Sequence, residues 1–178
     1  VIAEPLAGLL SPALAQAFSA DYCKRIVDAV QDEHFIVVYH NCGNTTILTI
    51  DSILSVGAKI LHFGNAIDMA DILPLMPADA LVMGNVDPAS QLRNGTPESV
   101  AARTTEILEA CSGYPNFVIS SGCDIPPMSK WENIDAYFAA VAMQVIGVER
   151  EKSALTPQEQ SSVMAVAAVI LMAVAGIQ

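Results

Sequence analysis

Short apolar runs alternate along the chain with longer stretches in which apolar residues recur every three or four positions. The runs are rich in β-branched and aromatic residues and predict strands at residues 1–4, 35–39, 59–63, 80–84 and 117–120. The stretches between them predict helices near residues 11–30, 45–57, 68–75, 96–111 and 131–145. The first helix begins at Ser11-Pro12, an N-cap followed by a proline at the first helical position. Five large apolar residues recur in it at helical spacing, namely Leu14, Phe18, Tyr22, Ile26 and Val30.

Five strand–helix units in a row predict a parallel sheet with right-handed crossovers. The strands are short and uniformly apolar, and polar residues follow each of them, which favours a (β/α)8 (TIM) barrel. A whole barrel needs about 200 residues or more, so we assign residues 1–148 to a partial barrel made of the last five βα units. Its open edges call for a missing N-terminal half-barrel or a homo-oligomer partner. Because a strand is predicted from Val1 onward, we expect an N-terminal part to be absent.

Residues 149–178 differ in composition from the rest of the chain. Ser153 to Ser162 is polar with one proline and predicts a linker. Val163 to Ile177 consists almost wholly of Ala, Val, Ile, Leu and Met and predicts a C-terminal apolar helix. This run is shorter than the roughly 20 residues that cross a membrane. We therefore expect a buried helix, with a membrane or partner-docking helix as the alternative.

Composition narrows the class of protein. A hydrophobic content of 53% with only 15% charged residues suits strands that are buried on both faces. The net charge of −11 argues against nucleic acid as a partner, because phosphates need Lys and Arg. Four cysteines do not make a disulfide framework in a chain of this length, and with no secretory signal at the start we expect the cytoplasm. Cys23 and Cys111 fall on apolar helix faces and are predicted to be core residues.

One histidine and two cysteines stand just after predicted strands, where side chains can converge. His40 and Cys42 lie two residues apart, and Gly43 lets the loop turn after them. Cys123 follows a different strand, and in a barrel all strands end at one rim. Three protein ligands with one open position are typical of a catalytic zinc. The alternative is a satisfied core histidine with two buried cysteines, since cysteine often packs as a small hydrophobe.

Five further polar residues at predicted strand ends are candidates for binding a substrate at the same rim: Glu4, His62, Asn65, Asn85 and Asp87. Asn85 and Asp87 can instead cap the turn that follows them, and His62 can face a neighbouring strand. The sequence has no Gly-rich phosphate loop of either standard spacing and no Gly-x-Ser-x-Gly elbow.

Four strings together resemble the uroporphyrinogen decarboxylase superfamily. They occupy residues 39–44, 83–88, 94–98 and 121–127. Within that superfamily they look most like the cobalamin-dependent methyltransferase branch, the methylcobamide:coenzyme M methyltransferase type. The resemblance covers roughly residues 1–145, the later part of that family's barrel. Its His-x-Cys and distant Gly-Cys pattern is fairly specific to the zinc branch, since the decarboxylases proper share the fold but lack the thiolate pair.

The resemblance implies that His40, Cys42 and Cys123 bind zinc. It also implies methyl transfer from a methylated corrinoid (cobalamin) to a small thiol acceptor, with the corrinoid brought by a partner protein. Zinc would hold the acceptor as a thiolate at neutral pH. Two other functions stay open, a metal-free decarboxylase acting on a tetrapyrrole and a non-catalytic barrel fragment that serves as an interaction module.

Overall fold

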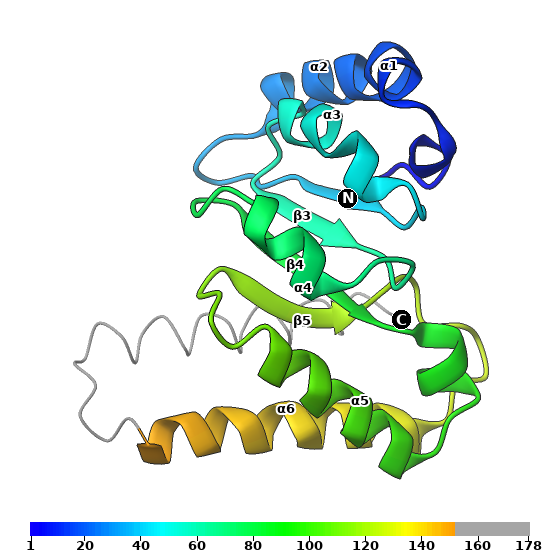
Figure 1. Cartoon of the computed structure of the whole chain (residues 1–178), viewed down its shortest axis with the longest axis vertical. Coiled ribbons are helices and arrows are strands. Elements are labelled where there is room, and N and C mark those ends of the chain that lie inside the picture. The colour runs from blue at the N-terminus through cyan, green and yellow to red at the C-terminus, as the bar shows by residue number, and fades with distance from the viewer. Residues whose placement is uncertain (152–178) are drawn as a thin grey trace.

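The computed structural model describes residues 1–151, with side chains to residue 144. Its five strands form one sheet in the order in which they occur: β1 (Ile2–Ala3), β2 (Val38–Asn41), β3 (Ile60–Phe63), β4 (Leu81–Val86) and β5 (Phe117–Ser121). Every neighbouring pair is parallel. Figure 1 shows the chain passing along the sheet from its blue to its orange end, with the strand arrows aligned.

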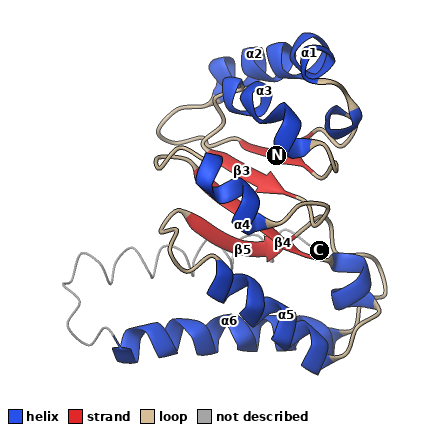
Figure 2. Ribbon diagram, in the orientation of Figure 1, coloured by secondary structure: helices blue, strands red, loops and turns tan. Residues whose placement is uncertain are grey.

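Helices follow each strand. They are α1 (Pro12–Ala15), α2 (Asp21–Val30), α3 (Ile50–Ser55), α4 (Met69–Ile72), α5 (Pro97–Ala110) and α6 (Trp131–Glu151). Five short 3-10 or π-helical turns accompany them: η1 (Ala7–Leu9), η2 (Gln16–Ala20), η3 (Thr46–Thr49), η4 (Leu73–Leu75) and η5 (Pro88–Arg93). In Figure 2 the helices α3 and α4 lie in front of the strands. The alternation confirms the predicted fold, five βα units that form part of a (β/α)8 barrel.

Local sequence explains where several helices begin and end. The Ser11 hydroxyl accepts a hydrogen bond from the Leu14 amide at the start of α1. Thr96 and Ser99 form a reciprocal capping box at the start of α5. Gly57 takes a φ of +76° just after α3, a conformation that glycine adopts without strain.

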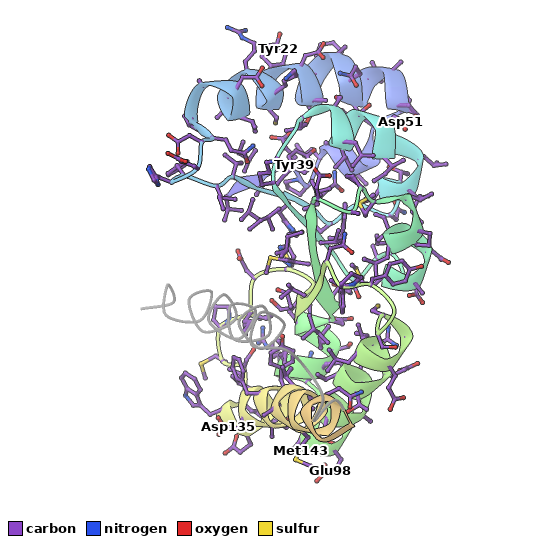
Figure 3. All side chains as sticks on the ribbon, turned by 90° about the vertical axis from the view of Figure 1, so that its left-hand side faces the viewer. Tyr22, Tyr39, Asp51, Glu98, Asp135 and Met143 are labelled. Atoms are coloured by element: carbon purple, nitrogen blue, oxygen red, sulfur yellow. The ribbon has the colours of Figure 1, made fainter. Side chains whose placement is uncertain are left out.

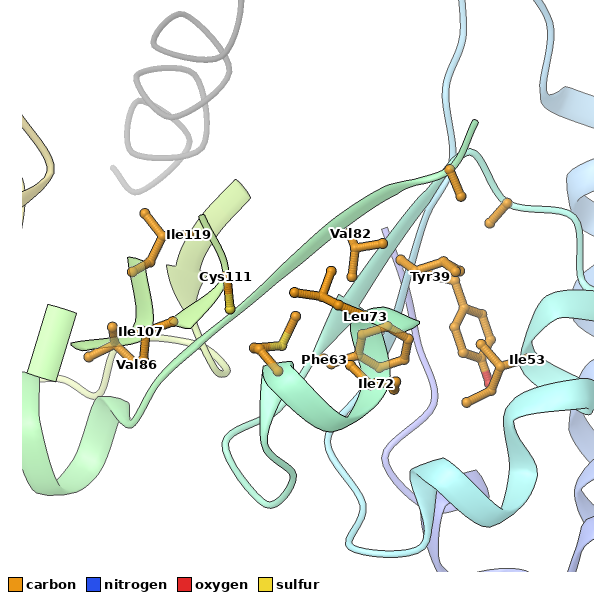
Figure 4. Close-up of a cluster of buried hydrophobic side chains, with 14 of the residues drawn as sticks. Tyr39, Ile53, Phe63, Ile72, Leu73, Val82, Val86, Ile107, Cys111 and Ile119 are labelled. Carbon is orange, nitrogen blue, oxygen red and sulfur yellow. The ribbon is translucent and has the colours of Figure 1, made fainter. Parts of the chain in front are cut away.

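The core lies between the strands and the helices that cover them. Phe63, Ile72 and Leu73 pack where α4 covers β3, with Val82 of β4 beside them (Figure 4). Burial of this kind, at about 25 cal/mol per Å² of apolar surface, is the main force that holds helices on a sheet. Cys23 and Cys111 are both buried in the core, as predicted.

The second strand begins later than its composition predicts. Phe35 and Ile36 are 58% and 54% exposed and lie outside β2. The register explains the difference, because β1 starts opposite Tyr39 and β3 starts opposite Val38. Residues 35 and 36 therefore have no strand on either side with which to pair, and their β-propensity alone does not make them a strand.

The expectations for residues 149–178 lie mostly outside the described residues. Helix α6 runs past residue 148, where we expected the barrel part to end, and continues to Glu151. The predicted linker and apolar helix fall from residue 152 onward and stay predictions. Within residues 1–151, no helix has both the length and the apolarity to cross a membrane.

Candidate metal centre

His40, Cys42 and Cys123 converge at the C-terminal rim of the sheet. The three ligand atoms that they offer lie within 4.8 Å of one another. In a flat sheet, the three strand spacings between β2 and β5 would separate these strands by about 14 Å. His40 Nε2 and Cys123 Sγ are nevertheless 3.6 Å apart. Curvature of the sheet and the loop after β5 together bring the residues to one place.

The loop after β2 is shaped so that Cys42 faces this point. The Asn41 side chain accepts hydrogen bonds from the Gly43 amide and from the Thr46 hydroxyl, which turns the chain directly after the strand. A methyl group on Gly43 would lie only 2.3 Å from Gly8 Cα, so the close approach of these two segments requires glycine. Gly64, after β3, packs in the same way against Cys42.

The loop after β5 is fixed by bonds to the two strands beside it. The Gly122 amide donates to the Val86 carbonyl at 2.7 Å. The Ser121 carbonyl accepts from His62 Nε2 at 2.7 Å, and the Ser121 hydroxyl donates to the Cys123 carbonyl at 2.8 Å. These bonds carry the chain across the end of β3 and leave the Cys123 side chain half-buried next to His40.

His40 is oriented so that its Nε2 can bind a metal. Its Nδ1 lies 3.2 Å from the carbonyl oxygen of His62. A carbonyl oxygen can only accept, so Nδ1 carries the hydrogen and Nε2 keeps its lone pair for a metal. The ring of His62 lies against that of His40, with centroids 4.6 Å apart. A backbone carbonyl behind the far nitrogen is the usual support of a metal-ligating histidine.

Burial shifts the pKa values of His40 and Cys42. Burial lowers the pKa of His40, and the bond to the His62 carbonyl and the charge of Asp124 do not offset it, which favours the neutral, ligating form. Burial also raises the pKa of Cys42, and the neighbouring Cys123 thiol raises it further. A positive charge next to the Cys42 sulfur would favour its thiolate, the form that binds a metal.

The spacing and the donor set suit zinc. Zinc binds sulfur at about 2.3 Å and nitrogen at about 2.0–2.1 Å, which at tetrahedral angles places N and S roughly 3.6 Å apart. The 3.6 Å between His40 Nε2 and Cys123 Sγ agrees with this value. Two thiols and one imidazole match the preference of zinc for N and S ligands, and three ligands leave a fourth position for a substrate.

Two of the candidate substrate residues lie beside these ligands. The His62 ring lies against His40, and the Ser120 hydroxyl is 3.3 Å from His62 Nε2. Asn65 is exposed, and its amide oxygen lies 2.8 Å from where a methyl group on Gly122 would sit. Asn65 therefore lies next to the loop that carries Cys123, at the C-terminal rim of the sheet.

The other three candidates form hydrogen bonds that support the fold, and they are Glu4, Asn85 and Asp87. The Glu4 carboxylate accepts from the Ser19 hydroxyl at 2.7 Å, so Glu4 is not brought to the three ligands. Asn85 is buried and donates to the Gly64 and Ile67 carbonyls, which fixes the loop after β3.

Asp87 caps η5 by accepting from the Ala89 and Ser90 amides. Desolvation by burial acts to raise the pKa of Asp87, but the hydrogen bonds from Ser90 and Ala89 outweigh it and hold the pKa below its ordinary value.

Sequence reasoning missed the supporting roles of Asn41 and Gly64. Asn41 is fully buried, and its side chain shapes the loop that carries Cys42. Gly64 carries no side chain between β3 and Cys42, which lets the two backbones approach. The Gly-Asn dipeptide at residues 64–65 is typical of a tight turn, and the sequence alone does not show that Cys42 lies against it.

Comparison with known proteins assigns the chain to a family. The family model described as "Uroporphyrinogen decarboxylase (URO-D)" matches residues 1–143. The chain belongs to the uroporphyrinogen decarboxylase family. This membership confirms the resemblance seen in the four strings.

The relatives are enzymes of two kinds. A uroporphyrinogen decarboxylase from Synechococcus sp. (strain CC9605) is 33% identical over 138 residues, which cover 75% of this chain and 37% of that protein. The methylcobamide:CoM methyltransferase MtbA from Methanosarcina acetivorans is also 33% identical over 138 residues, covering 75% of this chain and 38% of that protein.

A solved structure shows the same fold. The methyltransferase from Methanosarcina mazei has a TM-score of 0.67 and 27% sequence identity, covering 78% of this chain and 40% of that chain. The chain thus spans about two fifths of the length of the relatives that it matches. Family membership supports an enzyme, and the two kinds of relative leave the reaction to be argued from the site.

Proposed function

We propose that this chain forms the zinc-binding part of a methyltransferase that moves a methyl group from a methylated corrinoid to a thiol. The observation that carries the proposal is the convergence of His40, Cys42 and Cys123, with ligand atoms within 4.8 Å of one another. The similarity to MtbA, a methylcobamide:CoM methyltransferase, supports the same reaction class. The cytoplasm stays the proposed compartment, where the four free thiols of the chain would remain reduced.

Each of the three residues has a defined task in this proposal. His40 offers Nε2 because the His62 carbonyl holds its Nδ1 hydrogen. Cys42 and Cys123 offer their sulfurs from two loops. The Cys42 loop packs against Gly64 after β3, and the Cys123 loop is hydrogen-bonded to Val86 of β4. Zinc bound there would lower the pKa of an incoming thiol, which is about 8.5 when free, so that the thiol is present as a nucleophilic thiolate. We propose that Asn65, which is exposed next to the loop that carries Cys123, contacts the acceptor.

The reaction balances without another reagent. A methylated corrinoid would supply the methyl group, and the acceptor sulfur, held as a thiolate beside His40, Cys42 and Cys123, would take it. The electron pair of the broken carbon–metal bond would stay with the corrinoid. The thiol proton leaves to solvent. A corrinoid is a large molecule, so we propose that a corrinoid protein presents it at the rim.

A tetrapyrrole decarboxylase is the second candidate, favoured by the equal identity to a uroporphyrinogen decarboxylase. Decarboxylation has no need for two thiols and an imidazole around one point. The donor set therefore favours the methyltransferase, and zinc binding distinguishes the two functions.

The first test is zinc content. The chain, purified without added metal, should contain about one equivalent of zinc by elemental analysis. Cys42→Ser and Cys123→Ser should each lose it while keeping their helix content by circular dichroism. Cys111→Ala is the matched control, because Cys111 is buried at the end of α5 and should not affect zinc. Full zinc in both serine variants would reject the site.

The second test asks whether a thiol takes the fourth position. In the cobalt(II)-substituted protein, adding coenzyme M or homocysteine should increase the thiolate-to-metal absorption, and an alcohol of the same size should not. Zinc binding without any response to thiols would keep the metal site and reject the thiol acceptor. A protein that binds porphyrinogen but no zinc would support the decarboxylase.

A further inference from the structure

Two of the four cysteines lie close enough to react with each other. The sulfurs of Cys42 and Cys123 are within 4.8 Å, although one residue follows β2 and the other follows β5. The sulfurs of a disulfide are about 2.0 Å apart, so these two must approach by about 2.8 Å at most. Turning one cysteine side chain from one staggered position to the next moves its sulfur by about 3 Å. Side-chain rotation alone can therefore cover the separation.

The backbone on both sides of the pair is held, while the two sulfurs can be reached from solvent. Cys42 Cα and Cβ pack directly against Gly64. Gly122, directly before Cys123, is hydrogen-bonded through its amide to β4. Cys42 and Cys123 are half-buried, and Asp124, the next residue along the chain, is exposed. A small molecule at the C-terminal rim can therefore reach two thiols whose backbones keep them together.

The other two cysteines are placed differently. Cys23 and Cys111 are 4% and 2% exposed and belong to the hydrophobic core. Cys23 shares this core with Tyr39, which Figure 3 shows inside the molecule, below α2. Burial raises the pKa of both thiols, to about 11 for Cys111, and the thiolate is the form that attacks a disulfide. These two cysteines should remain thiols under conditions in which the pair at the rim reacts.

We propose that Cys42 and Cys123 form a reversible disulfide on reaction with the disulfide of a small thiol, and that this disulfide excludes zinc. One cysteine sulfur attacks the small disulfide, forms a mixed disulfide with it and releases one small thiol. The other cysteine sulfur then attacks the first and releases the second small thiol. The two protein sulfurs give up two electrons, which reduce the small disulfide, and the two thiol protons pass to the released thiols.

The disulfide removes two of the three metal donors. Zinc binds the thiolate form of cysteine, and a disulfide sulfur carries no such charge, so only His40 would remain as a ligand. This consequence rests on the proposed function, in which the acceptor is itself a small thiol. Its oxidised form is a small disulfide, so the chain would hold zinc only while its acceptor is reduced. The formation of the disulfide rests on the positions of the two sulfurs alone, and transient, redox-sensing disulfides are the kind that cytoplasmic proteins form.

Reaction with oxidised glutathione tests the disulfide directly. The full 178-residue chain is equilibrated with mixtures of oxidised and reduced glutathione, the remaining thiols are blocked, and the protein is digested with chymotrypsin. Tyr114 and Phe117 lie between Cys111 and Cys123, so chymotrypsin places these two cysteines on different peptides. Mass spectrometry should find two peptides joined through Cys42 and Cys123, and dithiothreitol should separate them.

Zinc content should fall as the disulfide forms. A chromophoric chelator should record zinc release in proportion to the joined peptides, with zinc content reduced on the order of tenfold when the pair is fully oxidised. Dithiothreitol followed by added zinc should restore the metal. Excess zinc should also shift the glutathione equilibrium back towards the two thiols, because it binds only the reduced form.

Three comparisons isolate the pair. Cys42→Ser should keep one glutathione on Cys123, because the second cysteine that would release it is missing. Cys111→Ala is the matched control and should form the disulfide as the unchanged chain does. The chain unfolded in guanidinium should form the disulfide on the order of tenfold less readily, because about 80 residues separate the two cysteines when the fold no longer holds them together.

A folded chain that yields no peptides joined through Cys42 and Cys123 would overturn the proposal. A disulfide that forms while zinc stays fully bound would overturn it as well, and so would equal formation in the folded and unfolded chains. A reduced chain that holds no zinc but still forms the disulfide would support the thiol pair and reject the proposed function. Zinc binding without any disulfide would reject the thiol pair and leave the proposed function standing.

Discussion

Replacing Gly64 with alanine should weaken zinc binding although residue 64 is not a ligand. A Cβ on Gly64 would lie 2.4 Å from Cys42 Cβ and 2.6 Å from Cys42 Cα, whereas ordinary contact begins at 3.4 Å, so the atoms must separate by about 1.0 Å. Both Cys42 atoms are fixed to the backbone, so a side-chain rotation cannot relieve the clash. The Cys42 sulfur is therefore expected to move.

The size of the effect follows from the tolerance of the metal. Zinc–ligand distances are held within about 0.2 Å of their ideal values, and a shift of about 1.0 Å exceeds that several times. Loss of a supporting contact typically lowers metal affinity about 10–100-fold, and Gly64→Ala should lose at least that much, or about 1.4–2.8 kcal/mol. Overpacking should also destabilise the metal-free protein by about 1–3 kcal/mol.

Competition with a chromophoric chelator gives the zinc Kd, and thermal unfolding of the metal-free protein gives the stability term separately. Gly113→Ala is the matched control, because a methyl group at Gly113 meets no atom within 4 Å, and both quantities should stay unchanged. A Gly64→Ala variant that is destabilised but binds zinc as tightly as the unchanged chain would refute the reasoning. In that case the backbone after β3 moves to make room for the added methyl group, and the position of the Cys42 sulfur is unaffected.

Two further predictions concern residues that support the rim. Asn133 is fully buried, and its amide donates to the Gln91, Leu92 and Gly95 carbonyls, so Asn133→Ala should cost about 1–3 kcal/mol. Differential scanning calorimetry should show a fall in Tm of roughly 2–10 °C for Asn133→Ala. Asn94→Ala is the control, because Asn94 is exposed, and its Tm should stay unchanged. An unaltered Tm for Asn133→Ala would contradict this role. The pKa of Asp87 is held below its ordinary value of 3.8, so its charge contributes stability above that pH, and the contribution is lost as pH falls through the lower folded value. Asp87→Asn should therefore have a lower Tm than the unchanged chain at pH 7, by an amount that shrinks below about pH 3.8, and a difference that does not vary with pH would argue against the charged cap.

The prediction of the fold rested on patterns that neighbouring residues make. Ser11-Pro12 and Thr96-Pro97 marked two helix starts that the structure confirms, because an N-cap bonds only to amides two or three residues ahead. The start of β2 was predicted three residues too early, because Phe35 and Ile36 have strand-like side chains but no strand beside them. Pairing is a long-range property that propensity does not contain.

The candidate site also has features that the sequence predicted and features that it did not. The residue types and their places after strands pointed to His40, Cys42 and Cys123, and the structure brings these three together. Glu4 had an equivalent place after a strand, yet its carboxylate turns to Ser19. Successive residues of a strand face opposite sides of the sheet, so one step in register decides whether a polar residue reaches the rim or the helices.

The sequence by itself determined the order of the elements, the helix caps and the chemical identity of the metal donors, because each of these depends on residues close together in the chain. Only the tertiary structure decided that the ends of β2 and β5 meet, that Gly64 makes room for Cys42, and that the Glu4 carboxylate turns to Ser19. These features depend on how the sheet curves and on which segments lie beside one another. Contacts of that kind join residues tens of positions apart, and no local pattern encodes them.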